Sequence, residues 1–503
     1  MKTDKYLPTI GLEIHTQLKT KSKMFCGCEN NSWKIGQEEL KPNSAICPVC
    51  TGQPGSLPVA NETAIKMVVK TGLALNCNIA VESKFDRKNY FYPDLPKGYQ
   101  ISQYDQPICQ YGFLEINQHK IGITRIHLEE DTAKSTHPAG TDYSLIDFNR
   151  AGIPLMELVT EPDIHSAKDA ADFCRQLQAI MRAIEVSDAD MEKSQMRCEV
   201  NISLALKNSN QLGTKVEIKN LNSFKSVERS IQYEIIRQSK LLDQAEKIKH
   251  QTRGWNELEQ KTFVQRNKEQ AGDYRYFPEP DLPILKFNQE YIKKIKSQLP
   301  ELPQEKIKRF QEQYNFSSTD CKLLVQNKAL ADFTENTMSE LRAWLADMDQ
   351  VDIEDEQTWQ KYSQKLSRLT ANWIINKLSG ILSSHKKTIE QVNLTPENFA
   401  EFITLIYASK VNSTNAVKLL EQMIKTGGDP SDILEDQGLH LIENLSDLEP
   451  VVDKIIADFP DQVSAYKSGK QTLLKFFIGQ TMKATSGKAN PKMAEELIIQ
   501  KLS

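Results

Sequence analysis

Apolar and polar residues alternate with a period of two along much of the N-terminal part of the chain. Side chains of a strand point alternately to its two faces, so this alternation is typical of strands buried on one side. It predicts strands over residues 9–18, 121–126, 143–148, 197–206 and 214–220. Helical spacing of apolar residues predicts amphipathic helices over residues 61–76, 166–185 and 223–242.

The pattern changes near residue 295. Beyond it the alternation disappears, and helical periodicity with long charged faces continues to the C-terminus. A Gly-Gly-Asp-Pro sequence at residues 427–430 interrupts the helical part and indicates a second boundary. We therefore expect an α+β protein, with a mostly antiparallel sheet domain over residues 1–295, an all-α domain over 296–428 and a small α-helical tail domain over 429–503.

Composition adds few constraints. The 503 residues carry a net charge of −4 and 39% hydrophobic residues, as in an ordinary globular protein. No run of about 18 apolar residues is present, and the N-terminus lacks an apolar signal region. We therefore expect a cytoplasmic protein with no membrane span, in which any contact with nucleic acid uses local basic patches.

The nine cysteines of such a chain indicate metal ligands and buried thiols rather than disulfides. Cys26 and Cys28 are separated from Cys47 and Cys50 by eighteen residues. Two close pairs separated by a loop can close a tetrahedral thiolate site, and four thiolates leave no open position for catalysis. This spacing predicts a structural zinc site, and the alternative is four independent buried cysteines.

Carboxylates and histidines gather in two places. Glu13 and His15 are two residues apart in a predicted strand and therefore share a face. Residues 123–163 hold His127 and a series of acids around a tight turn at residues 150–152. Oxygen ligands of this kind suit Mg²⁺ beside a phosphate. The alternatives are a surface Glu-His pair and a set of solvated acidic loops.

Residues 85–104 combine six aromatic residues and two prolines with basic and amide side chains. Because proline removes backbone donors, we expect an extended loop there and no regular element. Tyrosines beside basic side chains suit a loop that stacks a base or ribose and contacts phosphate, and an aromatic core loop is the alternative. Lysines also accumulate toward the C-terminus, as on a solvated helix face or an RNA contact surface.

Several common motifs are absent from the sequence. It has no Gly-x-x-x-x-Gly-Lys-Ser/Thr loop, no Gly-x-Gly-x-x-Gly sequence, and no His-Glu-x-x-His or Gly-x-Ser-x-Gly sequence. The Gly/Ser-rich tract of a Ser-Ser-Lys amidase is also absent. An ATP site would therefore not be a P-loop, and any hydrolysis of glutamine would belong to another polypeptide.

A series of motifs resembles the B-subunit family of the aspartyl/glutamyl-tRNA(Asn/Gln) amidotransferases, the GatB/GatE family. They are GLEIH at residues 11–15, CPVC at 47–50, RKNYFYPDLPKGYQISQY at 87–104, ITRIHLEED at 123–131, DFNRAGIPL at 147–155, GTKVEIKNLNSF at 213–224 and DYRYFPEPDLP at 273–283. The sequence GQTMKATSGKANP at residues 479–491 is similar to that family's tRNA-binding tail. The resemblance covers essentially the full chain.

The resemblance implies a fold and a reaction. In that family a cradle-like catalytic domain uses ATP and Mg²⁺ to phosphorylate the side-chain carboxylate of Glu on tRNA(Gln), or of Asp on tRNA(Asn). Ammonia from the partner amidase subunit then displaces the phosphate, and a small third subunit completes the heterotrimer. The acyl phosphate is needed because a free carboxylate repels ammonia and offers a poor leaving group. Such a transfer requires mainly metals and positioned charges.

Carried over residue by residue, the resemblance implies roles for positions of this sequence. The implied Mg²⁺ ligands are Glu13, His15, Glu129, Glu130, Glu157 and Glu217. The implied catalytic set is Glu13, His15, Glu129, Glu130 and Arg150. The implied substrate- and ATP-binding residues are Lys88, Tyr90, Tyr92, Lys97, Ser102, Tyr104, Asn149 and Lys219. The implied zinc ligands are Cys26, Cys28, Cys47 and Cys50, and the implied tRNA contacts of the tail are Lys475, Lys483, Lys488 and Lys492.

Two other functions fit parts of the sequence. A non-catalytic, zinc-stabilised module that presents tRNA to a partner enzyme would use the cysteines, the aromatic loop and the lysine-rich tail. It would leave Glu13, His15 and the Glu129-Glu130 pair unexplained, because RNA repels carboxylates unless a cation lies between them. A metal-dependent phosphohydrolase would use the acids but not the lysine-rich tail. We therefore expect an ATP-dependent ligase that acts on charged tRNA.

Overall fold

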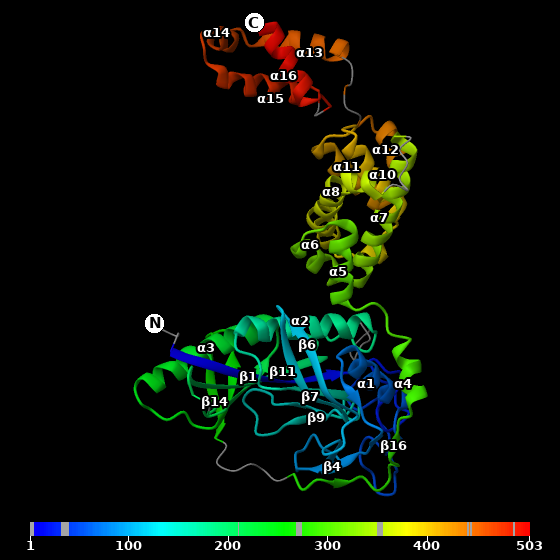
Figure 1. Ribbon diagram of the computed structural model, residues 1–503, viewed down its shortest axis with the longest axis vertical. Coiled ribbons are helices and arrows are strands. Elements are labelled where there is room, and N and C mark those ends of the chain that lie inside the picture. The colour runs from blue at the N-terminus through cyan, green and yellow to red at the C-terminus, as the bar shows by residue number, and fades with distance from the viewer. Residues whose placement is uncertain are drawn as a thin grey trace. The chain divides into compact units, whose positions relative to one another are not determined.

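A computed structural model describes residues 5–31, 40–209, 211–267, 274–349, 356–439, 442, 445–485 and 488–502. Asp273, Ser486 and Gly487 of the motifs above lie outside these residues. The chain divides into two compact units, residues 1–303 and 304–503 (Figure 1). The finer division into domains 1–295, 296–428 and 429–503 stays a prediction.

A nine-stranded sheet is the framework of the first unit, in the order β14-β13-β12-β11-β1-β10-β7-β6-β2. Neighbouring strands are antiparallel except β12 and β13, which are parallel. The strands are β1 (Tyr6–Gln17), β2 (Asn78–Ile79), β6 (Cys109–Ile116), β7 (His119–Glu130), β10 (Pro154–Thr160), β11 (Met196–Leu206), β12 (Val216–Leu221), β13 (Gln251–Asn256) and β14 (Lys261–Asn267). The predicted α+β class and the mostly antiparallel sheet are therefore confirmed.

Short strands form three smaller sheets beside it. The strands are β3 (Glu82–Ser83) with β16 (Leu285–Lys286), β8 (Lys134–Thr136) with β9 (Leu145–Asp147), and β4 (Asp86–Asn89) between β5 (Tyr99–Ser102) and β15 (Phe277–Pro278). The prediction that residues 85–104 form no regular element is wrong, because β4 and β5 pair in antiparallel fashion. Pro93 and Pro96 both lie in the connecting loop, where a missing backbone donor interrupts no ladder.

Capped helices cover one face of the large sheet. They are α1 (Glu62–Ala74), α2 (Ala167–Ala183) and α3 (Phe224–Asp243), and α4 (Gln289–Lys296) packs against α1. Asn61, Ser166 and Ser223 each accept a backbone N–H of the first turn, which explains why the three predicted helices begin where they do. Figure 1 shows α2 and α3 along one side of the sheet and β4 on the other.

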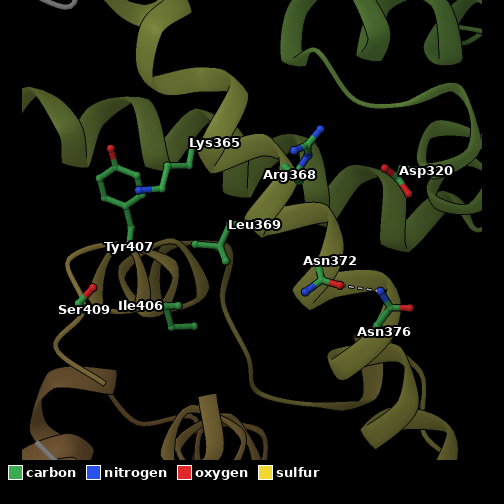
Figure 2. Close-up of a pocket in the computed structure, with 9 residues that line it drawn as sticks. All are labelled: Asp320, Lys365, Arg368, Leu369, Asn372, Asn376, Ile406, Tyr407 and Ser409. Atoms are coloured by element: carbon green, nitrogen blue, oxygen red, sulfur yellow. Dashed lines mark hydrogen bonds between the residues drawn. The ribbon is translucent and has the colours of Figure 1, made fainter. Parts of the chain in front are cut away.

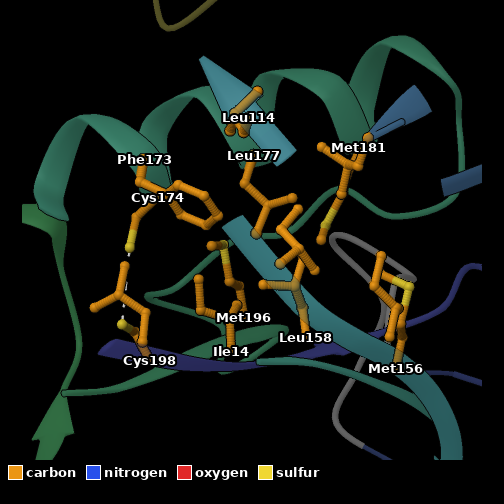
Figure 3. Packing of buried hydrophobic residues seen from close by; sticks show 14 of the residues in the cluster. Ile14, Leu114, Met156, Leu158, Phe173, Cys174, Leu177, Met181, Met196 and Cys198 are labelled. Carbon is orange, nitrogen blue, oxygen red and sulfur yellow. Dashed lines mark hydrogen bonds between the residues drawn. The ribbon is translucent and has the colours of Figure 1, made fainter. Parts of the chain in front are cut away.

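The apolar core of this unit lies between the sheet and α2. Phe173, Leu177 and Met181 point from α2 toward Leu158 and Met196 of the strands (Figure 3). All five side chains are buried. Because this face of the sheet is closed by apolar packing, the alternate side chains of the same strands are left to form a second, polar face.

The second unit is helical, as predicted. Its helices are α5 (Pro303–Tyr314), α6 (Ser318–Val325), α7 (Lys328–Asp349), α8 (Glu356–Asn372), α9 (Ser379–Ser384), α10 (Pro396–Tyr407), α11 (Ser413–Thr426), α12 (Pro430–Asp436), α13 (Leu445–Asp458), α14 (Pro460–Lys467), α15 (Leu474–Ala484) and α16 (Pro491–Leu502), with a π-helical turn η2 (Trp373–Leu378) and the 3₁₀ turns η3 (Ile389–Gln391) and η4 (Gln471–Leu473). One apolar core extends from Phe310 to Leu439, and α13–α16 enclose another around Phe477. Within the described ranges, no helix is both long and apolar enough to cross a membrane.

Glu234 joins α3 to the edge of the large sheet. Its side chain is fully buried and accepts hydrogen bonds from Arg237 (2.8 Å), Gln238 (2.9 Å) and Thr262 (2.6 Å). The Nε atom of Arg253 lies 3.2 Å from the same carboxylate. Burial alone would raise the pKa of Glu234, but these donors lower it.

We expect Glu234→Gln to lower the free energy of unfolding by about 3 kcal/mol, because it removes the anion that Arg237 and Arg253 share in a buried position. Unfolding in urea measures the difference from wild type. The lowered pKa means that Glu234 contributes stability above the pKa of an unfolded glutamate, about 4.3. This contribution is lost as the pH falls through the lower folded-state pKa, so the difference between the proteins should shrink in acid.

Glu246→Gln is the matched control, since Glu246 is an exposed carboxylate just beyond α3. It should change stability by less than about 0.5 kcal/mol. Equal losses in the two variants would contradict the role of Glu234.

Candidate active site and metal centres

The polar face of the large sheet carries an array of histidines and glutamates. Along β1, Glu13 and His15 point to this face, and Ile14 between them points to the apolar core. The register places His15 opposite Glu157 of β10, and Glu157 opposite His127 of β7. The Glu13 and His15 pair is therefore one part of a larger array.

Glu157 is the centre of this array. The residue is 4% exposed, and its Oε2 atom lies 3.2 Å from His15 Nε2 and 3.3 Å from His127 Nε2. The carboxylate of Glu129 lies 3.7 Å from each imidazole, and Glu13 Oε1 lies 3.9 Å from His15 Nε2. The array contains two triads that share Glu157, namely Glu13-His15-Glu157 and His127-Glu129-Glu157. Within each triad, the ligand atoms all lie within 4.8 Å of one another.

The charges of the array stabilise one another. Burial opposes the ionisation of Glu157 and Glu129. Even so, His127 and His15 hold the pKa of Glu157 well below its usual range, and His127 and Lys88 lower the pKa of Glu129. Burial also opposes the protonation of His127, but Glu157 and Glu129 raise its pKa to about 9. The pKa of His15 rises for the same reason, whereas burial and Glu157 raise that of Glu13. Carboxylates and imidazoles at these distances form a donor set that fits a divalent cation.

His127 belongs to the array although it is not among the ligands implied by the resemblance. It is 3% exposed, and its Nδ1 atom has no hydrogen-bond partner among the residues that the structure describes. The alternation in His127-Leu128-Glu129 places His127 and Glu129 on one face of β7. This alternation could have predicted that His127 lies beside Glu129. It could not predict that Glu157 lies between His15 and His127.

The β4–β5 hairpin contacts the array at Glu129. Ser102 donates a hydrogen bond from its Oγ atom to Glu129 Oε2 at 2.9 Å. Glu130, the next residue of β7, instead bonds with Lys97 and accepts the backbone N–H of Ile101 at 3.0 Å. Ser102 thus touches the array, whereas Glu130 lies outside both triads and forms an ion pair with Lys97.

Lys88 of β4 brings a positive charge toward the carboxylates. Its ammonium group lies 5.2 Å from the ring centre of Tyr274 and 5.9 Å from that of Tyr90. Burial opposes its protonation, but the negative charges of Glu129 and Glu157 raise its pKa. Lys88 is therefore charged at neutral pH and able to attract an anionic group to this face.

Tyrosine rings from two distant segments meet beside the hairpin. Tyr90 and Tyr92 lie with ring centres 6.0 Å apart, and Tyr104 stacks on Tyr276 at 4.2 Å with nearly parallel planes. Tyr92 and Tyr104 are each 59% exposed. Tyr274 and Tyr276 are absent from the binding residues named above, because only the pairing of β15 with β4 brings their segment to the site.

A network of Lys219 and two glutamates lies on the other side of the array. Lys219 Nζ is 2.8 Å from Glu199 and 3.6 Å from Glu217. Glu217 also accepts a hydrogen bond from Thr252 Oγ1 at 2.7 Å. Glu199 lies opposite Glu13 in the pairing of β11 with β1. Glu217 and Lys219 are therefore on the same face as Glu13 but outside the two triads.

Arg150 and Asn149 hold loops around the array. The Arg150 guanidinium donates to the backbone oxygens of Thr132 at 2.8 Å and Ala133 at 2.6 Å. The Asn149 side chain accepts the backbone N–H of Ala45 at 2.8 Å, which ties the cysteine-containing loop to the turn at residues 150–152. Both side chains are engaged with backbone groups of neighbouring loops.

The four cysteines named above form a separate cluster. The sulfur atoms of Cys26, Cys28, Cys47 and Cys50 lie within 4.8 Å of one another, so these are not independent buried thiols. Hydrogen bonding from Cys26 and the charge of Lys23, 3.8 Å from Cys50 Sγ, lower the pKa of Cys50 to about 4. Burial raises the pKa of Cys28 to about 11. Four sulfur atoms at this spacing fit a tetrahedral Zn²⁺ site.

The tail lysines lie on and between the last two helices. Lys475 and Lys483 belong to α15 and Lys492 to α16, and all three are exposed. Lys488 is half-buried in the segment between these helices. Contact of these lysines with tRNA stays a prediction.

Comparison with known proteins relates this arrangement to one family. Residues 8–293 match the family described as the GatB/GatE catalytic domain, and residues 356–502 match the family described as the GatB domain. Proteins named as the B subunit of aspartyl/glutamyl-tRNA(Asn/Gln) amidotransferase are similar to the whole chain. Those of Thermodesulfovibrio yellowstonii and Dehalococcoides mccartyi are each 44% identical and covered over 98% of both chains. That of Thermotoga maritima is 43% identical, with 99% of both chains covered.

We expect the purified chain to contain one zinc ion and Cys47→Ser to lose it, because a serine hydroxyl does not replace a thiolate in such a site. Elemental mass spectrometry of the purified proteins measures the zinc content. Cys321→Ser is the control, since Cys321 is a buried cysteine of the helical unit. Full zinc in Cys47→Ser, or none in wild type, would contradict a four-thiolate site.

Proposed function

The chain belongs to the GatB/GatE family, the B subunits of tRNA-dependent amidotransferases, and on this premise we propose that it activates and amidates an amino acid attached to tRNA. The enzyme is a ligase that forms a carbon–nitrogen bond. The substrate in this proposal is Glu on tRNA(Gln) or Asp on tRNA(Asn). The products are Gln-tRNA(Gln) or Asn-tRNA(Asn), ADP and phosphate.

The observation that carries this proposal is the buried array around Glu157. A nine-stranded sheet places two imidazoles and three carboxylates on one face, inside the part of the chain that matches the catalytic domain. Glu13, His15, Glu129 and Glu157, joined by His127, are the residues that would hold Mg²⁺ there. When bound, Mg²⁺ would neutralise the phosphate oxygens of ATP during phosphoryl transfer.

The proposed reaction has two steps. A carboxylate oxygen of the aminoacyl group attacks the γ-phosphorus of ATP, the bond to the bridging oxygen breaks, and ADP leaves. Ammonia then attacks the acyl carbon, phosphate leaves with the electron pair of the carbon–oxygen bond, and the nitrogen loses a proton. Lys88 attracts the anionic phosphates, and the exposed rings of Tyr92 and Tyr104 offer faces on which a base can stack.

Two partner proteins complete the proposal. Ammonia is reactive and is supplied by an amidase partner, since this sequence contains no Ser-Ser-Lys amidase tract. A small third protein completes the heterotrimer. The exposed lysines of α15 and α16 are the proposed contacts for the tRNA.

The second candidate is a non-catalytic module that presents tRNA to another enzyme. It would account for the tail lysines and the cysteine cluster. It would not explain why the pKa values of the buried carboxylates Glu157 and Glu129 are lowered. Negative charge without a bound cation also opposes the binding of RNA phosphates. The catalytic function is therefore preferred.

Phosphate release distinguishes the two functions. The chain, purified with its two partner proteins, is mixed with [γ-³²P]ATP, Mg²⁺ and Glu-tRNA(Gln), without glutamine or ammonia. We expect release of labelled phosphate that depends on the charged tRNA, followed by formation of Gln-tRNA(Gln) when ammonia is added. Binding of tRNA with no phosphate release, for both Glu-tRNA(Gln) and Asp-tRNA(Asn), would establish the presenting module instead.

In the same assay, Glu157→Gln should slow ADP formation by a factor on the order of 10²–10³, because the amide keeps the shape of the side chain but removes the charge that both triads share. Filter binding should give an unchanged affinity for tRNA. Glu115→Gln is the control, since Glu115 is an exposed carboxylate of β6 in the same sheet. Equal rates for Glu157→Gln and wild type would remove Glu157 from the catalytic site.

A further inference from the structure

Arg125 is a cation on the polar face of the sheet to which the reaction proposed above assigns no role. It lies on β7 two residues before His127, so it shares a face of the strand with His127 and Glu129. Its Nη2 atom lies 3.8 Å from Glu157 Oε1. Arg125 therefore borders the array at the carboxylate that both triads share.

The guanidinium of Arg125 has a donor that the fold does not use. A separation of 3.8 Å is too long for a hydrogen bond, so the contact with Glu157 is an ion pair only. The Nε atom is buried and has no hydrogen-bond partner among the residues that the structure describes. Because a buried donor without a partner is costly and uncommon, the edge formed by Nε and Nη2 is suited to a further acceptor.

Arg87 of β4 shows how the same edge is used when the chain itself supplies the partner. Its Nε and Nη2 atoms donate to the two carboxylate oxygens of Glu279 at 2.7 and 2.9 Å. Glu157 does not engage Arg125 in this way, and its Oε2 atom instead lies beside the two imidazoles. The side chain of Arg125 is 37% exposed, so an oxyanion that enters the site can reach it.

We propose that Arg125 binds the γ-phosphate of ATP and holds the phosphoryl group while it moves to the aminoacyl carboxylate. Two parallel N–H bonds from one guanidinium edge match two oxygens of a phosphoryl group. Arginines beside a transferring phosphoryl group stabilise the charge on its oxygens. The guanidinium remains protonated, so Arg125 donates hydrogen bonds and transfers no proton. This inference rests on the reaction proposed above and adds the residue that binds its transferring group.

A hollow of about 660 Å³ in the helical unit is the alternative location for the phosphates of ATP (Figure 2). Lys365 and Arg368 line it, and Lys365 Nζ lies 4.6 Å from the ring centre of Tyr407. Among the described residues that line it, Asp320 is the one acid, and its carboxylate already accepts a hydrogen bond from Ser317 Oγ at 2.7 Å. The array offers a larger donor set for the divalent cation that accompanies ATP, and it is therefore preferred.

The first test compares two nucleotides that differ by the γ-phosphate. Calorimetry measures binding of β,γ-imido-ATP and of ADP, each with Mg²⁺, to the chain purified with its two partner proteins. Arg125→Gln should bind imido-ATP at least about tenfold more weakly and ADP as wild type does, because only imido-ATP presents a γ-phosphate to this edge. Arg229→Gln is the matched control, an exposed arginine of α3 that lies 3.5 Å from a carboxylate oxygen of Glu257, and it should bind both nucleotides normally.

The second test separates a ligand of phosphate from a counter-ion of Glu157. Arg125→Lys keeps a positive charge beside Glu157 but loses the paired donors of the guanidinium. In the phosphate-release assay, Arg125→Lys and Arg125→Gln should both slow ADP formation by a factor on the order of 10² or more, with unchanged affinity for tRNA. A counter-ion alone predicts a wild-type rate for Arg125→Lys, and this result would overturn the proposal.

Other results would also overturn it. Equal losses of imido-ATP and ADP affinity in Arg125→Gln would show that Arg125 does not recognise the γ-phosphate. Weaker imido-ATP binding in Arg368→Gln, with normal binding in Arg125→Gln, would place the γ-phosphate in the hollow. A raised KM for Glu-tRNA(Gln) with normal imido-ATP binding would assign Arg125 to the aminoacyl carboxylate. Absence of phosphate release in wild type would contradict the proposed reaction instead, and the comparison of imido-ATP with ADP would still decide whether Arg125 binds the γ-phosphate.

Discussion

The carboxylate of Glu157 between two imidazoles is the interaction on which the rest of the site depends. A buried negative charge is costly unless groups of opposite charge surround it. His15 and His127 supply those groups from the strands on either side of β10. Their pKa values rise and that of Glu157 falls, because each group stabilises the opposite charge beside it. A site prepared in this way needs little rearrangement when charge develops on a phosphoryl group.

The large sheet holds this array in a fixed geometry, because one face of the sheet packs against helices while the other face carries the array. α2 packs on the apolar face, so the strands cannot rotate or shift register without exposing their core. The polar face is bordered by the β4–β5 hairpin on one side and by the Lys219 network on the other. The cysteine cluster joins this frame through Lys23, which donates to the backbone oxygen of Phe148 at 3.3 Å beside the turn at residues 150–152. Metal ligands on strands, held by packing and loops, are positioned more accurately than ligands on loops alone.

The helical unit carries basic surface features, and none of its described residues belongs to the array. Its exposed tail lysines and the hollow beside Lys365 are both basic features of a chain whose net charge is only −4. Local positive patches of this kind attract phosphates without making the whole protein cationic. The sheet carries the array and the helices carry basic surfaces. This arrangement fits an enzyme whose substrate is a small reactive group on a large polyanion.

The sequence by itself determined the local structure and part of the site. Alternation of apolar and polar residues identified β1, β7, β11 and β12 of the large sheet and put Glu13 and His15 on one face, but it missed β6, β10, β13 and β14. Cysteine spacing identified the thiolate cluster. Tertiary structure decided which strands are neighbours, because alternation defines faces but carries no information about pairing partners. Only the order β1-β10-β7 places Glu157 between two histidines, and only the pleat after Glu129 turns Glu130 toward Lys97. Pairing between segments distant in sequence depends on the folding of the whole sheet, and this is why the sequence named Glu157 only as one implied ligand among six and not as the centre of the site.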